Sequence, residues 1–260
     1  MIYPISAETL PEILRLEAGR DVAESSLYWS DCWEPAFYVA LAREGFISIA
    51  LADQEHGELI VAELQEAYAV LDWGDFHVSR KLAKLLRSER LVELAPELRL
   101  GDSCERVLER LADYHGRDTW LIPSLHQLFL DLERTPPPGF RLHAVELWSG
   151  SEERLVAGEL GYSIGRTYTS LSGFCRPEER RWRHFGTLQL HLLARALEER
   201  GYAFWNLGHP QLAYKHAIGA QVVPRTRFLQ RWRAAVGDEP NRPLDGTLSI
   251  SPKESARSGA

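Results

Sequence analysis

The first third of the chain changes from a helical to a strand-like spacing of its apolar residues. Over residues 8–18 leucines and an isoleucine recur at helical intervals, which predicts a short amphipathic helix. Two β-like runs follow at residues 46–51 and 59–62, with a turn-rich stretch between them. A third strand is expected at residues 68–71, before an Asp-Trp-Gly-Asp turn. We therefore expect residues 1–75 to form a small N-terminal α+β module.

Three helices are predicted in the middle of the chain. Residues 78–91 place basic side chains on one side and leucines on the other, which is typical of an exposed amphipathic helix. A second helix is expected at residues 103–115, where Ser103 can cap its start. A third helix begins at Pro123 and ends before the proline run at residues 136–138, because proline cannot continue a helix.

The last third predicts a β meander followed by alternating helix and strand. Strand candidates stand at residues 140–148, 155–164 and 166–174, and a long amphipathic helix follows at 186–200. The remaining elements are a short buried strand at 203–207, a helix near 210–217 and a strand at 222–223. This order predicts an α/β (α+β) fold with a central mixed sheet flanked by helices.

The domain boundaries follow from the same pattern. We expect the sheet and its helices to form one domain over residues 76–236. Residues 237–260 are polar and rich in proline, glycine and serine, which predicts a disordered tail.

Composition narrows the class of protein. With 260 residues, 45% of them hydrophobic, the chain suits one large or two modest globular domains. No run approaches the roughly 18 apolar residues of a membrane span, and the N-terminus lacks the pattern of a secretory signal. The three cysteines, Cys32, Cys104 and Cys175, show no metal-ligand spacing. These features favour a cytoplasmic protein without a membrane partner, a metal or a disulfide framework.

The net charge of −7 argues against general nucleic-acid binding. Binding to RNA would therefore require a local basic surface. The best candidates lie on the predicted basic helix, and they are Arg80, Lys81, Lys84, Arg87 and Arg90. A run of charges also fits an ordinary solvated helix face.

Five segments, in order and at compatible spacing, carry a resemblance to a known family. They are residues 76–82 (Phe-His-Val-Ser-Arg-Lys-Leu), 119–122 (Thr-Trp-Leu-Ile), 143–148 (His-Ala-Val-Glu-Leu-Trp), 155–162 (Leu-Val-Ala-Gly-Glu-Leu-Gly-Tyr) and 217–229, which holds Ile-Gly-Ala and Pro-Arg. Together they resemble the leucyl/phenylalanyl-tRNA–protein transferases over residues 76–232. Before Phe76 the resemblance fades.

The resemblance implies a GNAT-like fold and transfer of an aminoacyl group from tRNA to an α-amine. It implies an aminoacyl-tRNA donor and no cofactor. We expect the transferred aminoacyl group to be apolar and the chain to act as a monomer. An aminoacyl ester is already activated, so such an enzyme mainly positions the amine and assists the loss of its proton.

One departure from the family concerns the acceptor. The family carries Gly-Glu-Ser-Met-Phe on the strand that lines its active site, where this chain has residues 170–174 (Ser-Leu-Ser-Gly-Phe). Leu171 thus replaces the glutamate that is thought to hold a basic acceptor, and an unpaired cation there would be costly to bury. We expect a different acceptor, either a small-molecule amine or an apolar peptide N-terminus.

A second departure concerns the family's Asp-Xaa-Gln pair, assigned to proton and hydrogen-bond relay. Asn206 stands opposite the aspartate, and an asparagine holds geometry but cannot take a proton. The glutamine falls on Gly208 or His209, depending on one gap, and Gln211 lies nearby. His209 could be the replacement base, since imidazole titrates near pH 6.5.

The expected site follows from these matches. Asn206, with His209 or Gln211, would hold the attacking amine or the ester carbonyl. The expected aminoacyl pocket is lined by Trp120, Leu171, Ser172, Gly173 and Phe174. Structural roles fit the same residues: Trp120 and Phe174 as core, Asn206 as a strand-end partner of backbone groups, and His209 as a surface side chain.

Two other functions remain open. Acyl-CoA-dependent GNAT N-acyltransferases use a glycine-rich turn before a helix to hold pyrophosphate. Residues 181–186 (Arg-Trp-Arg-His-Phe-Gly) keep the second glycine of that turn and have His184 in place of the first. A catalytically silent relative that binds tRNA or a peptide is the other alternative.

Overall fold

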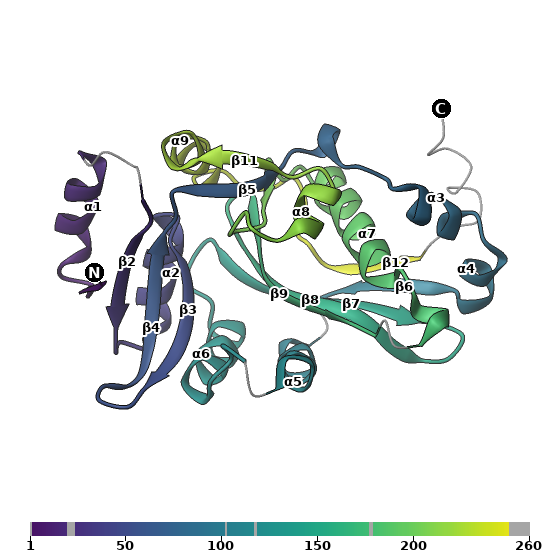
Figure 1. Ribbon diagram of the computed structural model, residues 1–260, viewed down its shortest axis with the longest axis horizontal. Coiled ribbons are helices and arrows are strands. Elements are labelled where there is room, and N and C mark those ends of the chain that lie inside the picture. The colour runs from purple at the N-terminus through teal and green to yellow at the C-terminus, as the bar shows by residue number, and fades with distance from the viewer. Residues whose placement is uncertain (1, 20–23, 102, 117–118, 177–178, 250–260) are drawn as a thin grey trace.

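The chain folds around two β-sheets, seen side by side in Figure 1. This computed structural model describes residues 2–19, 24–101, 103–116, 119–176 and 179–249. A smaller sheet of four strands lies at the N-terminal end, and a larger sheet of eight strands makes up most of the molecule. The expected α/β class with a mixed central sheet and flanking helices is confirmed.

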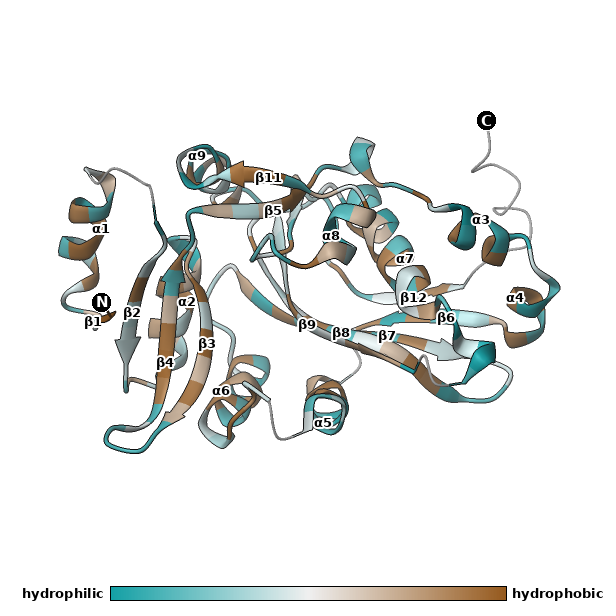
Figure 2. Cartoon of the chain, viewed as in Figure 1, coloured by the Kyte–Doolittle hydropathy of each residue, from teal (hydrophilic) through white to brown (hydrophobic). Residues whose placement is uncertain are grey.

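The smaller sheet has the strand order β1-β2-β4-β3. Its strands are β1 (Ile2–Pro4), β2 (Ser26–Ser30), β3 (Ile47–Asp53) and β4 (Gly57–Leu64), and its helices are α1 (Leu10–Ala18) and α2 (Pro35–Arg43). The predicted helix at 8–18 and the strands at 46–51 and 59–62 are confirmed. The turn between β3 and β4 is hydrophilic, as its teal colour in Figure 2 shows. No strand at 26–30 or helix at 35–43 was expected from the sequence.

The larger sheet has the order β11-β5-β10-β9-β8-β7-β6-β12. Its strands are β5 (Ala67–Leu71), β6 (Pro96–Leu100), β7 (Phe140–Ser149), β8 (Arg154–Ile164), β9 (Thr167–Cys175), β10 (Phe204–Asn206), β11 (Gln221–Pro224) and β12 (Gly246–Ser249). Only the β9–β10 pair is parallel among those that the structure describes in this sheet. Strand β5 was expected beside the N-terminal strands, but it pairs with β10 and β11 instead.

Helices cover both faces of the larger sheet (Figure 1). On one face lie α5 (Cys104–His115) and α6 (Pro123–Arg134), and on the other lies α7 (Phe185–Glu199). Two further helices, α8 (Ala213–Ala217) and α9 (Arg225–Val236), flank β11, and 3-10 turns stand at Trp73–Asp75 and Arg180–Trp182. Each long helix buries its apolar side against the strands, which is the usual way to exclude water from an α/β core.

The predicted basic helix at 78–91 is in fact two helices. They are α3 (Arg80–Leu86) and α4 (Glu89–Leu94). Ser88 interrupts them because its backbone is extended, with ψ 145°, and its hydroxyl donates to the Leu85 carbonyl oxygen at 2.7 Å. Helical spacing of apolar residues continues across the break, so periodicity alone could not reveal it.

The expected disordered tail is partly ordered. Within residues 237–260, β12 pairs antiparallel with β6, from Gly246 opposite Leu100 to Ser249 opposite Glu97. Edge pairing of this kind satisfies backbone groups regardless of side-chain polarity, which explains why a polar composition did not predict it. Residues 250–260 lie outside the described residues.

A buried ion pair joins the two sheets. Arg225, the first residue of α9, donates to a Glu17 carboxylate oxygen of α1 at 2.9 Å, and both side chains are almost fully buried. Glu17 also accepts hydrogen bonds from Ser26 at 2.8 Å and Tyr28 at 2.6 Å. The guanidinium further donates to the Gln65 carbonyl oxygen at 2.7 Å and to that of Leu64. One arginine therefore ties α1, β2 and the β4–β5 connection to α9.

We expect Arg225→Met to destabilise the protein by about 3–5 kcal/mol, because the Glu17 carboxylate would stay buried without its cation. The midpoint of urea unfolding measures the change. Arg233→Met is the matched control on the same helix, since the Arg233–Glu44 pair spans 4.0 Å and is more exposed on both sides. Such a pair contributes about 1 kcal/mol or less. Equal losses in the two variants would contradict the structural role of Arg225.

Candidate active site

A cavity arises where two parallel strands separate. Strands β9 and β10 pair from Thr167 opposite Phe204 to Thr169 opposite Asn206, and the pairing ends there. Beyond that point β9 continues, held only by β8, while the chain after β10 turns away through Gly208, whose φ of 70° favours glycine. A cavity of about 450 Å³ occupies the space between the diverging segments. We call it the β9–β10 cavity.

Elements from both faces of the sheet reach this cavity. The end of α5 contributes Tyr114 and His115, the start of α7 contributes Gly186 to Leu190 apart from Leu188, and the segment through α8 contributes Leu207, Leu212, Tyr214 and Lys215. Figure 1 shows α7 and α8 on one side of β9 and α5 on the other. An open, parallel strand edge of this kind is a common location for a ligand site in α/β proteins.

A β-bulge explains how six consecutive residues of β9 line the cavity. Ser170 pairs with Gly161 and Ser172 pairs with Leu160, so Leu171 is an extra residue without a partner on β8. A bulge turns side chains that would otherwise alternate between the two faces. Residues 170–175 all border the cavity, including the expected pocket residues Leu171, Ser172, Gly173 and Phe174.

A buried carboxylate forms part of the cavity wall. Glu159, on the central strand β8, is only 3% exposed and borders the cavity. One of its oxygens accepts hydrogen bonds from the Tyr168 hydroxyl at 2.9 Å and the Ser170 hydroxyl at 2.7 Å. The other oxygen accepts from the side-chain amide of Gln189 at 3.1 Å. Burial raises the pKa of Glu159, and these three hydrogen bonds partly oppose the rise.

Gly161 makes room for this arrangement. A Cβ atom at this position would stand 2.2 Å from the Tyr168 hydroxyl oxygen, so any side chain would displace the hydroxyl that reaches Glu159. The Trp205 indole N–H donates to the Ser170 hydroxyl oxygen at 2.8 Å, which leaves the hydroxyl proton of Ser170 to donate to Glu159. Backbone and side chains of three strands thus converge on one carboxylate.

A buried lysine also borders the cavity. The Lys215 ammonium, on α8, donates to the carbonyl oxygens of Leu207 at 2.5 Å and His209 at 2.7 Å. Burial lowers its pKa to about 8. Beside it, burial and the charge of Glu159 raise the pKa of Tyr214 to about 12. The cavity therefore holds a carboxylate, a hydroxyl and an amine whose proton affinities are all displaced from their ordinary values, a combination typical of functional sites.

The expected relay residues occupy different surroundings. Asn206 is buried next to the cavity: its side-chain oxygen accepts from the Gly208 N–H at 2.9 Å, and its amide donates to the Thr169 hydroxyl at 3.3 Å. It stabilises the turn at which the two strands part. His209 and Gln211 are exposed, and neither borders the cavity.

Trp120 is half-buried and lies apart from the cavity lining. Its ring meets Phe129 edge to face, with 6.0 Å between ring centroids, at the margin of the core under α5 and α6. The functional roles of Trp120, Asn206, His209 and Gln211 stay predictions.

Sequence reasoning missed Glu159, Gln189 and Lys215. A signal for Glu159 was present, because it is the one charged residue in residues 155–164, a strand candidate rich in apolar residues, and a charge in a buried strand needs a reason. Lys215 and Gln189 gave no such signal, since helices commonly carry both residue types on solvated sides.

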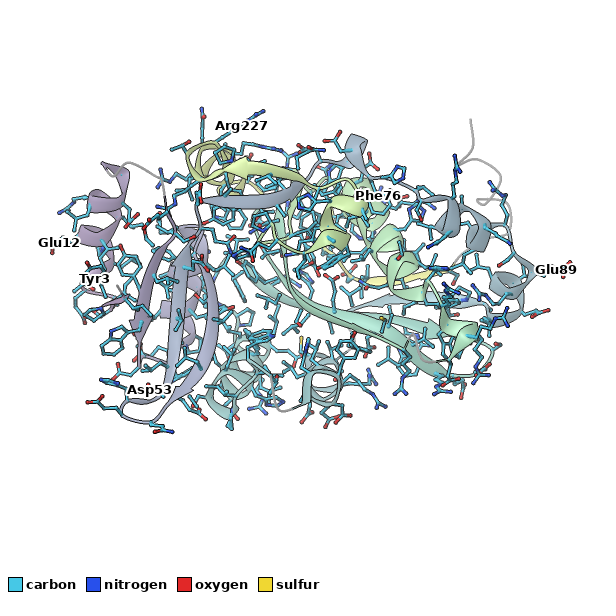
Figure 3. The ribbon with its side chains drawn as sticks, viewed as in Figure 1. Tyr3, Glu12, Asp53, Phe76, Glu89 and Arg227 are labelled. Atoms are coloured by element: carbon cyan, nitrogen blue, oxygen red, sulfur yellow. The ribbon has the colours of Figure 1, made fainter. Side chains whose placement is uncertain are left out.

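The basic residues 80–90 lie beside a second basic segment, residues 180–184 (Arg-Arg-Trp-Arg-His), in the loop before α7. Arg80, Lys81, Lys84 and Arg87 are exposed on or beside α3. On α4, Arg90 donates to the Arg180 and Arg183 carbonyl oxygens, each at 3.3 Å, which binds that helix to the loop before α7. Glu89, labelled in Figure 3, marks this end of the molecule, opposite Glu12.

The same loop ends in a strained residue. His184 has a φ of 74° immediately before α7, in the left-handed region that favours glycine. Burial lowers the pKa of His184, and the positive charges of Arg183, Lys81 and Arg90 lower it further. His184 thus adopts a backbone conformation that favours glycine, next to the positive charges of Arg183, Lys81 and Arg90.

The described residues offer neither a metal centre nor a membrane span. No group of three or more histidine, cysteine or acidic side chains there could hold a metal ion. None of the helices in that part of the chain is long and apolar enough to cross a membrane.

Comparison with known proteins gives a consistent result. A sequence model described as leucyl/phenylalanyl-tRNA protein transferase matches residues 70–233. The leucyl/phenylalanyl-tRNA–protein transferase of Rubrobacter xylanophilus is 29% identical over 168 residues, which cover 65% of this chain and 78% of that protein. The protein of the same name from Bordetella bronchiseptica is 30% identical over 187 residues, covering 69% of this chain and 68% of that protein.

Among solved structures, FemX has a TM-score of 0.42 at 11% identity, covering 84% of this chain and 74% of that one. L-PGS from Bacillus licheniformis has a TM-score of 0.40 at 12% identity, and the match covers 80% of this chain and 61% of that one.

We expect Glu159→Gln to stabilise the protein at neutral pH. Because the pKa of Glu159 is higher in the folded than in the unfolded protein, its contribution to stability is fully present at low pH and declines as the pH rises from the unfolded towards the folded pKa. A glutamine avoids this loss and keeps the hydrogen bonds if the Gln189 amide turns over. The gain in melting temperature should therefore grow between pH 4 and pH 8. For a domain of this size, each kcal/mol gained in the free energy of unfolding raises the melting temperature by about 2–4 °C.

The control is Glu146→Gln on β7. Glu146 is equally buried, but it is paired with Arg106 at 2.7 Å and lies outside the cavity, so its replacement should lower the melting temperature. A Glu159→Gln variant that loses stability at pH 8 as Glu146→Gln does would contradict an unneutralised charge at Glu159.

Proposed function

The chain belongs to the leucyl/phenylalanyl-tRNA protein transferase family, and on that premise we propose that it transfers an aminoacyl group from tRNA to an acceptor amine in the β9–β10 cavity. The family consists of aminoacyltransferases with an aminoacyl-tRNA donor and a protein acceptor. The expected resemblance over residues 76–232 is confirmed by the match at 70–233.

The observation that carries the proposal is the cavity at the end of the β9–β10 pairing. It borders the strand residues 171–174 that the family resemblance places in the active site. Its volume of about 450 Å³ lies within the range of about 300–1,000 Å³ typical of small-molecule sites, which leaves room for an aminoacyl group and an attacking amine. Leu171, Phe174 and Leu212 supply apolar wall, and Glu159 and Lys215 supply polar groups.

The reaction requires that the amine and the ester carbonyl are held together and that one proton moves from the amine to the ribose oxygen. The neutral amine attacks the ester carbonyl, the C–N bond forms, and the C–O bond to the ribose breaks. The amine loses a proton and the ribose oxygen gains one, so no net proton is consumed. Holding amine and ester together supplies most of the rate. In this proposal Leu171 to Phe174 contact the aminoacyl group, and Asn206 positions the turn that forms the cavity.

His209 and Gln211 are proposed to contact substrate outside the cavity, since both are exposed between Gly208 and α8. The proposed acceptor is an amine that Leu171 does not have to neutralise, either a small-molecule amine or an apolar N-terminus. We also propose that the protein acts as a monomer in the cytoplasm. Its three cysteines, all in the described residues, form no disulfide, which fits a reducing compartment.

The proposed tRNA-binding surface consists of Arg80, Lys81, Lys84, Arg87 and Arg90. Two features support it: Arg80, Lys84 and Arg87 are among its exposed side chains, and Arg90 joins them to the basic loop before α7. A local surface of this kind allows a protein of net charge −7 to bind phosphates.

A transfer assay tests the proposed function. Transfer RNA charged with labelled amino acids is incubated with the protein and with peptides of varied N-termini or small amines. We expect label to enter an acceptor as a base-stable amide. Hydrolysis alone, without an acceptor-dependent product from any donor, would reject the transferase proposal.

Salt dependence tests the tRNA surface. The double variant Lys81→Ala/Lys84→Ala should weaken tRNA binding and flatten the slope of log K against log salt, by about 0.7–0.9 for each phosphate that the variant no longer neutralises. Filter binding at a series of salt concentrations measures the slope. Arg227→Ala is the control, because Arg227 is an exposed arginine of α9, away from α3 (Figure 3). An unchanged slope in the double variant would place tRNA elsewhere.

A further inference from the structure

The charge balance of the β9–β10 cavity is incomplete. Glu159 has three hydrogen-bond partners, and all three are neutral side chains, Tyr168, Ser170 and Gln189. None of the ion pairs among the described residues includes Glu159. The cavity's own lysine directs its ammonium to two carbonyl oxygens instead. A buried carboxylate without a cation is costly, and proteins normally pair it or leave it neutral.

The hydrogen bonds favour the ionised form of Glu159. In the observed contacts all three partners donate to the carboxylate, and the Ser170 oxygen also receives the Trp205 N–H. Each of these hydrogen bonds lowers the pKa of Glu159 and so opposes the rise that burial causes. The three donors therefore favour a carboxylate beside open space, and a cation that enters the cavity would supply the counter-charge that the surrounding side chains lack.

We infer that Glu159 is a specificity residue that binds a cationic nitrogen of the substrate, a protonated amine or a guanidinium, in the β9–β10 cavity. The inference deepens the proposed function and rests on it for the identity of the substrate as an aminoacyl donor or its acceptor. The cation can come from the side chain of the amino acid being transferred or from an ammonium group of the acceptor. Both sources present the same chemistry to Glu159.

The surrounding walls fit such a ligand. Leu171 and Leu207 border the cavity together with Glu159 and can pack against the methylene groups of a lysine-like or arginine-like chain, while its charged end pairs with the carboxylate. A purely apolar side chain would bury Glu159 without neutralising it, which disfavours leucine-like groups at this position.

Binding of small ligands tests the inference without tRNA. Calorimetric titration compares Nα-acetyl-lysine amide, leucine amide and the neutral Nα-acetyl-leucine amide. We expect at least one cationic ligand to bind at least tenfold more tightly than the neutral one. Preference for Nα-acetyl-lysine amide indicates a side-chain cation, and preference for leucine amide indicates an α-ammonium. Equal binding of all three, or no binding of any, would overturn the inference.

Variants attribute the preference to the carboxylate. Glu159→Gln keeps the shape of the site and should lose at least tenfold in affinity for the preferred cation, with little change for the neutral ligand. Glu146→Gln, a buried carboxylate outside the cavity, should keep the preference. A preference that survives in folded Glu159→Gln protein, checked by its melting curve, would assign cation binding to another group and reject the inference.

The transfer assay separates this result from the proposed function. If cationic ligands bind through Glu159 but no aminoacyl-tRNA serves as donor, the inference stands and the transferase proposal fails. If transfer occurs with equal efficiency from leucyl- and lysyl-tRNA and to charged and uncharged acceptors, the proposed function stands and the inference fails.

Discussion

The site depends on the short parallel pairing of β9 and β10. Three residue pairs hold the strands together, and the pairing ends at Thr169 and Asn206. Strand β9 stays ordered beyond that point because β8 supports its other edge as far as Cys175. The departing strand therefore opens a space beside a fixed strand, where α5, α7 and α8 can all reach. Asn206 secures the point of departure through its bonds to Gly208 and Thr169.

Glu159 stands in the wall of that space at a cost in stability. Burial disfavours its charge, and three neutral donors compensate only in part. The fold nevertheless provides for it, since Gly161 leaves room for the Tyr168 hydroxyl and Trp205 orients Ser170. A destabilising group that several neighbours support is more readily explained by substrate binding than by folding, because an apolar residue would serve the core better.

The smaller sheet lies outside the segment that the family match covers, residues 70–233, yet it is firmly joined to the rest. Arg225 of α9 and Glu17 of α1 form a buried ion pair across the junction, and the Tyr68 hydroxyl of β5 donates to the Gly45 carbonyl oxygen, just before β3, at 2.9 Å. The family segment therefore supplies one partner of the ion pair, and the N-terminal segment supplies the other.

The sequence by itself determined most elements, the family and the pocket strand of residues 171–174, because helical and strand spacing and ordered motifs are local properties of the chain. The sequence pattern did not predict that β5 belongs to the larger sheet, that the basic helix breaks at Ser88, or that the polar β12 pairs with β6. Strand partners and chain turns depend on distant segments of the chain. It also could not bring Glu159, Gln189 and Lys215 to one cavity. Only the tertiary structure decided this, because their meeting depends on where β9 and β10 separate.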